Sequence, residues 1–201
     1  MSTATLPDAA ATPAVAGAGA IPLARLTGEQ YDRMVDLGVI GESDRIELIA
    51  GLLVKKMPKS RLHQLVLIAV ARWLGRLPAG FHTEQGAPIK LVDGRPEPDV
   101  CVVLGQPEDY LEHPAADRIP LVVEVAGSSL AVDLGLKAEA YAAAGIPLYL
   151  VVDLASRTLH LHSGPSPTGY EQVAAAPEHA ITIDGHSLGT LRAGDLFPAD
   201  S

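Results

Sequence analysis

The sequence has little cysteine and few aromatic residues. Of its 201 residues only Cys101 is a cysteine, so the chain can form no internal disulfide and no cysteine-based zinc cluster. Aromatic residues make up 4% of the chain and hydrophobic residues 48%, so its core must be largely aliphatic. Cys101 lies inside an apolar run, which favours a buried core thiol over a catalytic nucleophile. A single cysteine also fits a reducing, cytoplasmic location.

Positive charge is scarce too, and long hydrophobic runs are missing. The formal net charge is −9 at pH 7, which disfavours a protein that coats nucleic acid through bulk positive charge. No stretch reaches the roughly 18 apolar residues that a membrane helix needs, so we expect no membrane association. The first 20 residues are rich in Ala, Pro, Gly and Thr and contain no Lys or Arg. They predict a disordered tail at 1–20, followed by a single folded domain at 21–198.

Hydrophobic periodicity and turn residues together predict an alternation of helices and strands. Helices are expected at 27–38, at 60–76 and from Ser128 or Ser129 to 144. Strands are expected at 45–49, 52–57, 81–85, 88–92, 98–104, 119–126, 148–153, 157–162, 170–174 and 180–183. A loop with one helical turn is expected at 105–120, and another loop begins at Ser163. This order indicates a mixed sheet flanked by helices, an α/β or α+β fold.

Two acidic residues interrupt predicted apolar strands. Asp99 begins the run DVCVVL, and Glu124 is flanked by valines in IPLVVEVA. A carboxylate in such a run is costly unless it is paired, hydrogen-bonded or bound to a metal. If the two strands are neighbours, both acids can converge on one point, and two oxygen ligands suit Mg²⁺. A buried acid that pairs with an arginine or caps a backbone group is the alternative, but two acids on consecutive strands favour a metal site.

Three further features could belong to the same site. Asp133, Lys137 and Tyr141 share one helical face, so Lys137 is either a surface partner of Asp133 or a cation directed at a metal and a phosphate. Glu47, in RIELI, either completes the acid cluster or forms the polar face of a hairpin. His63 is more typical of a surface or capping histidine than of a residue facing the cleft.

Basic residues are concentrated in the segment 55–76, which contains Lys55, Lys56, Lys59, Arg61, Arg72 and Arg76. This basic segment is either a phosphate-facing edge or the solvated face of a hairpin and a helix. If it lines one cleft with the acids, an enzyme acting on nucleic acid is favoured. If it lies on the opposite face, that hypothesis is weakened.

Four stretches occur in a fixed order: RIELIAGLLVKKMPKSRLHQ, PEPDVCVV, IPLVVEV and LKAEAYAAAGIPLYLVVD. Together they resemble the PD-(D/E)XK nuclease superfamily and, more closely, its Uma-two branch, over about residues 25–175. The resemblance implies a restriction-endonuclease-like fold and a Mg²⁺ or Mn²⁺ cofactor. It implies that Asp99 and Glu124 bind the metal with support from Glu47. It also implies that Lys137 is the motif lysine, displaced from the position that Ala126 occupies.

The first functional hypothesis is therefore a metal-dependent endonuclease that hydrolyses DNA phosphodiester bonds, with Asp99, Glu124, Lys137 and Glu47 as its catalytic residues. The resemblance further leads us to expect a homodimer. A second hypothesis is a non-catalytic binding or regulatory module on the same scaffold, which the net charge of −9 slightly favours. A third is a hydrolase acting on another phosphate-containing substrate, which nothing in the sequence separates from a DNA-cleaving enzyme.

Overall fold

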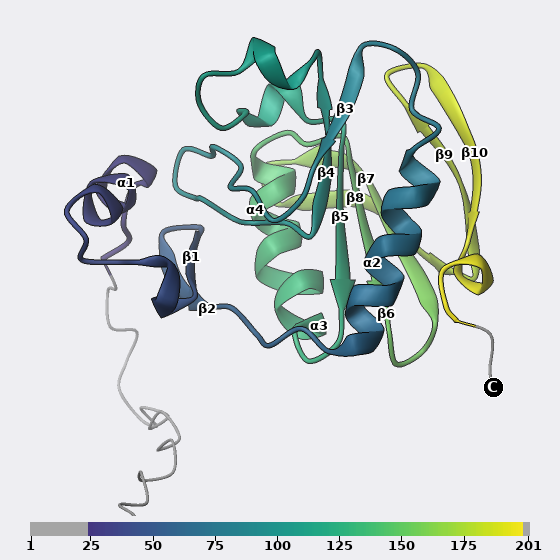
Figure 1. Ribbon diagram of the computed structural model, residues 1–201, viewed down its shortest axis with the longest axis horizontal. Helices are drawn as coiled ribbons and strands as arrows, with labels where there is room; N and C mark the ends of the chain where they lie inside the picture. Colours follow the sequence, from purple (N-terminus) through teal and green to yellow (C-terminus); the bar gives the residue numbers. More distant parts are fainter. Residues whose placement is uncertain (1–23, 199–201) are drawn as a thin grey trace, which may run out of the picture.

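The computed structural model describes residues 24–198, and its centre is a six-stranded sheet with the strand order β3-β4-β5-β6-β7-β8 (Figure 1). The strands are β3 (Phe81–Glu84), β4 (Val100–Leu104), β5 (Leu121–Ala126), β6 (Leu148–Asp153), β7 (Thr158–Ser166) and β8 (Gly169–Ala176). Neighbouring strands are antiparallel except β5 and β6, which are parallel. The predicted mixed sheet flanked by helices is therefore confirmed. The tail predicted at 1–20 lies outside the described residues.

The two faces of this sheet pack against different elements because successive strand residues point in opposite directions. On one face, Val100 and Val102 pack with helix α2 (Arg61–Leu74) and the hairpin of β9 (Glu178–Ile183) and β10 (His186–Arg192). On the other face, Cys101 and Val103 pack with the crossover between β5 and β6. That crossover consists of α3 (Leu130–Val132), a π-helical turn (Asp133–Lys137) and α4 (Ala138–Ala143). Cys101 is a buried thiol, as predicted.

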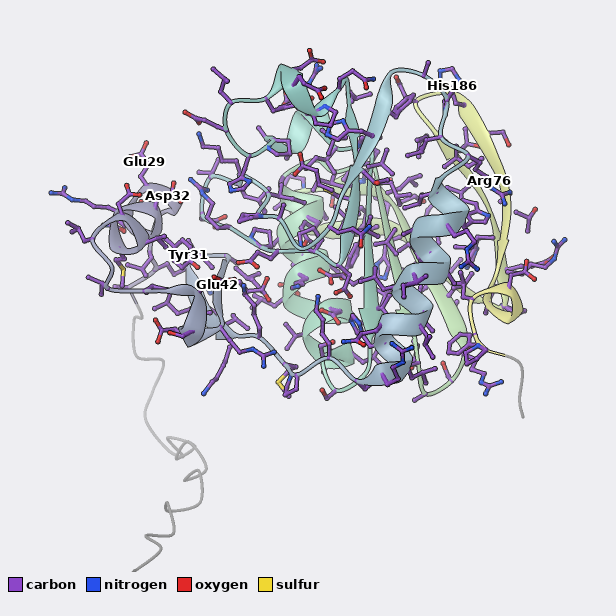
Figure 2. The ribbon with its side chains drawn as sticks, in the orientation of Figure 1. Glu29, Tyr31, Asp32, Glu42, Arg76 and His186 are labelled. Atoms are coloured by element: carbon purple, nitrogen blue, oxygen red, sulfur yellow. The ribbon has the colours of Figure 1, made fainter. Side chains whose placement is uncertain are left out.

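The N-terminal elements lie at one side of the sheet. Helix α1 (Gly28–Asp36) begins with the predicted capping box, in which Thr27 and Gln30 bond each other's backbone N–H. The Tyr31 hydroxyl donates to the Ile46 carbonyl at 2.9 Å and thereby fastens α1 to the hairpin of β1 (Ile46–Ile49) and β2 (Leu52–Lys55) (Figure 2). This hairpin was predicted, and it holds Glu47 in a buried strand.

Among the strands and the loops that join them, the structure differs from the sequence prediction at three places. The strand expected at 88–92 is wrong: Lys90 and Leu91 form only isolated bridges, because the Leu91 N–H closes a tight turn onto the Gly94 carbonyl. The loop expected from Ser163 is wrong as well, since β7 continues to Ser166 and pairs with β8. The strand β10 was not predicted.

The connecting loops contain short 3-10 turns: Glu42–Asp44, Pro107–Asp109, Ala116–Arg118 and Ala193–Asp195. The second and third lie in the loop where one helical turn was expected. No helix within residues 24–198 is long and apolar enough to span a membrane.

His162 is a buried histidine among aromatic rings, and it provides a test of the packing of the outer strands. Its ring lies 5.4 Å from that of Tyr149 and 5.6 Å from that of Tyr170, measured between centroids. Burial, with a smaller effect from nearby His160, lowers the pKa of His162 to about 4. The unfolded chain therefore binds a proton at His162 as the pH falls through about 6.5, whereas the folded chain binds it only near pH 4. The stability that depends on neutral His162 is present above pH 6.5 and is lost as the pH falls towards 4.

We expect His162→Phe to reduce this acid destabilisation by about 1–2 kcal/mol between pH 7 and pH 4.5. Urea unfolding at both pH values measures the effect. His113→Gln, at an exposed position, is the control for the loss of one histidine. Identical pH slopes for the wild type and His162→Phe would show that His162 titrates normally in the folded protein.

Candidate active site

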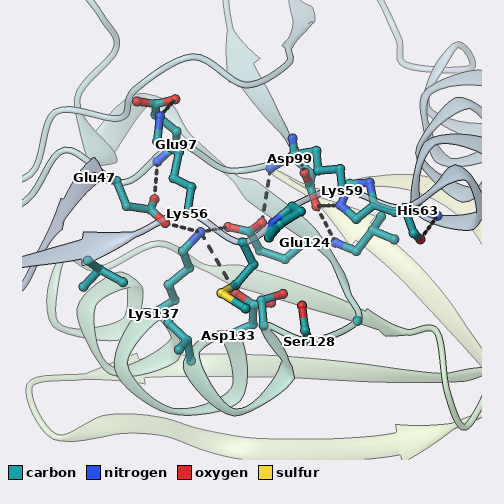
Figure 3. A pocket seen from close by; sticks show the side chains of 18 of the residues that line it. Glu47, Lys56, Lys59, His63, Glu97, Asp99, Glu124, Ser128, Asp133 and Lys137 are labelled. Atoms are coloured by element: carbon teal, nitrogen blue, oxygen red, sulfur yellow. Dashed lines mark hydrogen bonds and ion pairs between the residues drawn. The ribbon is translucent and has the colours of Figure 1, made fainter. Parts of the chain in front are cut away.

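The register between β4 and β5 places Asp99 and Glu124 next to each other. Val100 pairs with Val123 in this antiparallel ladder, so the residue before Val100 faces the residue after Val123. The Asp99 N–H donates to Glu124 Oε2 at 3.2 Å, and the Val125 N–H donates to Asp99 Oδ2 at 2.8 Å (Figure 3). Both acids are buried. The structure thus brings together the two acids that the sequence singled out.

Lys137 lies at the centre of the carboxylates, where it is 5% exposed. Its Nζ is 2.8 Å from Glu124 Oε1 and 3.3 Å from Glu47 Oε1 (Figure 3). Asp133 Oδ1 is 4.0 Å away from the same nitrogen. The interpretation of Asp133 and Lys137 as a surface pair is therefore wrong, because both side chains are buried in the acid cluster.

The crossover helix positions Lys137 through a π-helical turn. Residues Asp133–Lys137 form this turn between α3 and α4, and such turns occur frequently at functional sites. Tyr141, one turn further on, donates its hydroxyl to Glu124 Oε1 at 3.3 Å. The expected helix from 128–129 to 144 exists only as this interrupted segment. Ser129 occupies the N-cap position of α3, as predicted, but its side chain makes no capping hydrogen bond.

The other side of the site is formed by the start of α2. Ser60 caps this helix, as predicted, by accepting the His63 N–H at 3.2 Å. His63 Nε2 lies 2.9 Å from Asp99 Oδ2, and Lys59 Nζ lies 2.8 Å from Asp99 Oδ1. The expectation that His63 is a surface or capping histidine is wrong, because it is buried against the predicted acid.

Sequence reasoning missed the part that Lys59 and Asp133 play in this site. Lys59 immediately precedes the helix cap, which turns the chain at the pocket. Asp133 precedes Lys137 by four residues, a spacing that brings helical neighbours together. These positions were visible in the sequence, but the direction of a side chain relative to a distant strand was not.

Burial and neighbouring charges shift the pKa values of Asp99 and Glu124 in opposite directions. Burial alone would raise the pKa of Asp99, but hydrogen bonds from His63 and Lys59 outweigh it and hold the pKa at about 2. For Glu124, complete burial outweighs the attraction of Lys137 and raises the pKa to about 8, with Asp99 adding repulsion. Burial opposes the charge of Lys137, but the surrounding carboxylates raise its pKa above the usual range.

A pocket of about 310 Å³ joins the acids to part of the basic segment. Its basic lining comes from Lys55, Lys56 and Lys59 of the basic segment and from Lys137, and its acidic lining includes Glu47, Glu97, Asp99, Glu124 and Asp133. Arg61 and Arg72 do not line it, and Arg76 instead packs over the Trp73 ring on the side of α2 near β10 (Figure 2). Only the first part of the basic segment therefore shares the cleft with the acids.

The donor chemistry of this pocket fits a hard divalent cation. Within residues 24–198, no group of three or more His, Cys, Asp or Glu side chains is arranged to hold a metal ion. Mg²⁺ commonly uses one or two carboxylates and keeps several waters, so Asp99 and Glu124 are a sufficient set of donors. Glu47 adds a third carboxylate beside Lys137, and its Oε2 accepts the Glu97 N–H at 2.9 Å.

Comparisons with known proteins show the family and the fold of this chain. The sequence profile of the Uma2 family, described as "Putative restriction endonuclease", matches residues 29–190. The fold is similar to that of "a putative nuclease belonging to DUF820" from Anabaena variabilis, with a TM-score of 0.64 over 86% of this chain and 97% of that chain. Sequence identity to that protein is 14%, so this likeness shows the fold alone. No curated protein matches the chain. Because the profile covers most of the sequence, the protein belongs to the Uma2 family, and this membership supports a nuclease function.

Proposed function

We propose that this protein is a divalent-metal-dependent endonuclease that hydrolyses DNA phosphodiester bonds. One observation carries the proposal: two buried strand carboxylates, Asp99 and Glu124, meet a buried lysine in a pocket that is also lined by exposed lysines. Burying this many charges is costly, and such costly clusters are concentrated at functional sites. The family description adds independent support for a nuclease.

The proposal gives each residue a role. Asp99 and Glu124, supported by Glu47, would hold Mg²⁺ or Mn²⁺, which when bound polarises a phosphate and lowers the pKa of a water. Asp99 is held in its ionised form by its hydrogen bonds, so it can serve as a ligand at neutral pH. Lys137 fixes the Glu124 carboxylate through the 2.8 Å contact and supplies a permanent positive charge beside the place where phosphate charge would develop.

The first part of the basic segment provides the complementary attraction for DNA. Lys55, Lys56 and Lys59 lie on the pocket lining, although the chain as a whole carries a net charge of −9. Positive charge gathered at a cleft can draw in a phosphate backbone that the rest of the surface repels. We therefore expect binding to weaken steeply with salt.

The test compares the wild type with Asp99→Asn. Calorimetry with Mn²⁺ measures metal binding, and relaxation of supercoiled plasmid in Mg²⁺ or Mn²⁺ measures cleavage. We expect Asp99→Asn to abolish both, because the amide cannot replace the anionic ligand. Glu97→Gln is the matched control, since Glu97 lines the same pocket and pairs with Lys56 but is not a proposed ligand. It should retain metal binding and cleavage.

The outcomes separate the functional hypotheses. Metal binding without DNA cleavage would point to a different phosphate-containing substrate. A folded wild type that neither binds metal nor cuts DNA would favour the binding or regulatory module instead. Homodimer formation and a cytoplasmic location remain predictions, and sedimentation of the same preparation tests the first of them.

A further inference from the structure

Lys59 is a half-exposed cation paired with a buried acid. Its side chain is 47% exposed, whereas that of its partner Asp99 is 6% exposed. Their contact, Nζ to Oδ1, is 2.8 Å long. The other carboxylate oxygen of Asp99 is already bonded by the Val125 N–H and by His63. Lys59 thus covers the side of Asp99 that faces the pocket and the solvent.

Lys137 and Lys56 do not share this combination of properties. Lys137 is fixed from several sides, and its side chain is 6% exposed. Lys56 is partly exposed and comes from the same linker as Lys59, but it pairs with Glu97. Lys59 is therefore the cation in the described pocket that is both easily moved and placed on a proposed metal ligand.

The linker around Lys59 allows the side chain to leave. Residues 57–60, between β2 and α2, are exposed, and their backbone is held at the two ends, where Arg45 donates to the Met57 carbonyl at 3.0 Å and where Ser60 caps the helix. An ion pair whose lysine is half-exposed is weaker than a fully buried pair, because solvent screens it and ordering the long side chain costs entropy. A divalent cation next to Asp99 repels the ammonium group and replaces it as the carboxylate's counter-charge.

We propose that Lys59 is an exchangeable counter-ion: it neutralises Asp99 until a divalent cation binds, and is then released to contact a substrate phosphate at the rim of the pocket. This inference rests on the metal site of the proposed function. It makes metal loading and DNA binding mutually favourable, because the same ammonium group leaves one partner for the other. By linkage, each ligand then raises the affinity for the other by the same factor.

The first experiment is Mn²⁺ calorimetry on the wild type, Lys59→Met and Lys56→Met. Lys59→Met removes the competing cation, so we expect it to bind Mn²⁺ about three- to fivefold more tightly than the wild type. Lys56→Met removes the same charge from the same linker without freeing a proposed ligand, and its affinity should change less than about twofold. Should Lys59→Met fold poorly, Lys59→Gln provides the same removal of charge with a polar side chain.

The second experiment follows the lysine itself in the wild type. Brief acetylation with an N-hydroxysuccinimide ester, read by peptide mass spectrometry, reports how accessible each amine is. We expect Mn²⁺ to increase the labelling of Lys59 several-fold and to leave that of Lys56 unchanged. This readout depends neither on cleavage nor on DNA.

The results distinguish failure of this inference from failure of the proposed function. If the wild type binds Mn²⁺ but Lys59→Met binds it no more tightly than Lys56→Met does, the metal site stands and the counter-ion role is wrong. Unchanged labelling of Lys59 in saturating Mn²⁺ leads to the same conclusion. If no variant binds Mn²⁺, the proposed metal site fails and this inference fails with it.

Discussion

Replacing Lys137 with methionine is expected to lower the free energy of unfolding by about 3–5 kcal/mol at pH 7. The substitution keeps most of the volume of the side chain but removes the charge that faces Glu124, Glu47 and Asp133. Glu47 and Asp133 would then lose their buried counter-charge, and Glu124, whose pKa is about 8, would ionise only at a still higher pH. Urea unfolding with EDTA present measures the loss, since EDTA prevents a metal ion from taking the place of the lysine.

The same substitution should reduce plasmid cleavage by about 10²–10³-fold, the usual effect of removing one preorganised charge from an active site. Because an unfolded variant would also fail to cleave DNA, cleavage is measured under conditions in which Lys137→Met is still fully folded. Tyr141→Phe is the matched control, because it removes a neutral donor to the same Glu124 oxygen. It should cost only about 1 kcal/mol of stability.

A double variant sharpens this prediction. Adding Glu124→Gln to Lys137→Met removes the carboxyl group that Lys137 contacts most closely, so the effects of the two substitutions on stability should not add, while cleavage stays low. Additive losses of stability would contradict the expected coupling. They would show that Lys137 stabilises the fold through packing of its stem rather than through the carboxylates.

The core of this site was predictable because buried charge is rare and costly. Asp99 and Glu124 stand out in the sequence as acids inside valine-rich runs. Their convergence needed only that the two strands be neighbours, which β4 and β5 are. The hairpin that carries Glu47 was predictable as well, since Ala50 and Gly51 form its turn, both with positive φ.

The remaining parts depend on geometry that local patterns do not encode. His63 looks like an ordinary first-turn histidine, and only the packing of α2 on the sheet turns it toward Asp99. The π-helical turn before α4 leaves no signature in hydrophobic periodicity, so the burial of Asp133 could not be foreseen. In β7, Gly164 and Pro165 are residues typical of a loop. Pro165 nevertheless pairs with Tyr170 of β8, because β6 ends opposite Ser163 and a proline can lie in a strand whose other side has no neighbour.

Glu124→Gln is expected to abolish Mn²⁺ binding and plasmid cleavage and yet to stabilise the metal-free protein at alkaline pH. The folded protein holds a proton on Glu124 up to a pKa of about 8, whereas the unfolded chain releases it near 4.5. The stabilisation due to this group is therefore fully present below pH 4.5 and is lost as the pH rises through 8. Glutamine does not titrate, so the variant escapes that loss.

Urea unfolding at pH 5, 7 and 9 in EDTA should show the stability of Glu124→Gln rising relative to the wild type by roughly 2–4 kcal/mol across this range. Glu97→Gln controls for the removal of a carboxylate from the same pocket. A stability difference that stays constant from pH 5 to pH 9 would mean that Lys137 keeps Glu124 ionised throughout in the folded state. A stability difference that rises with pH, together with lost metal binding, would show that Glu124 binds the metal but destabilises the metal-free protein. This combination is expected of a residue that is retained for function rather than for stability.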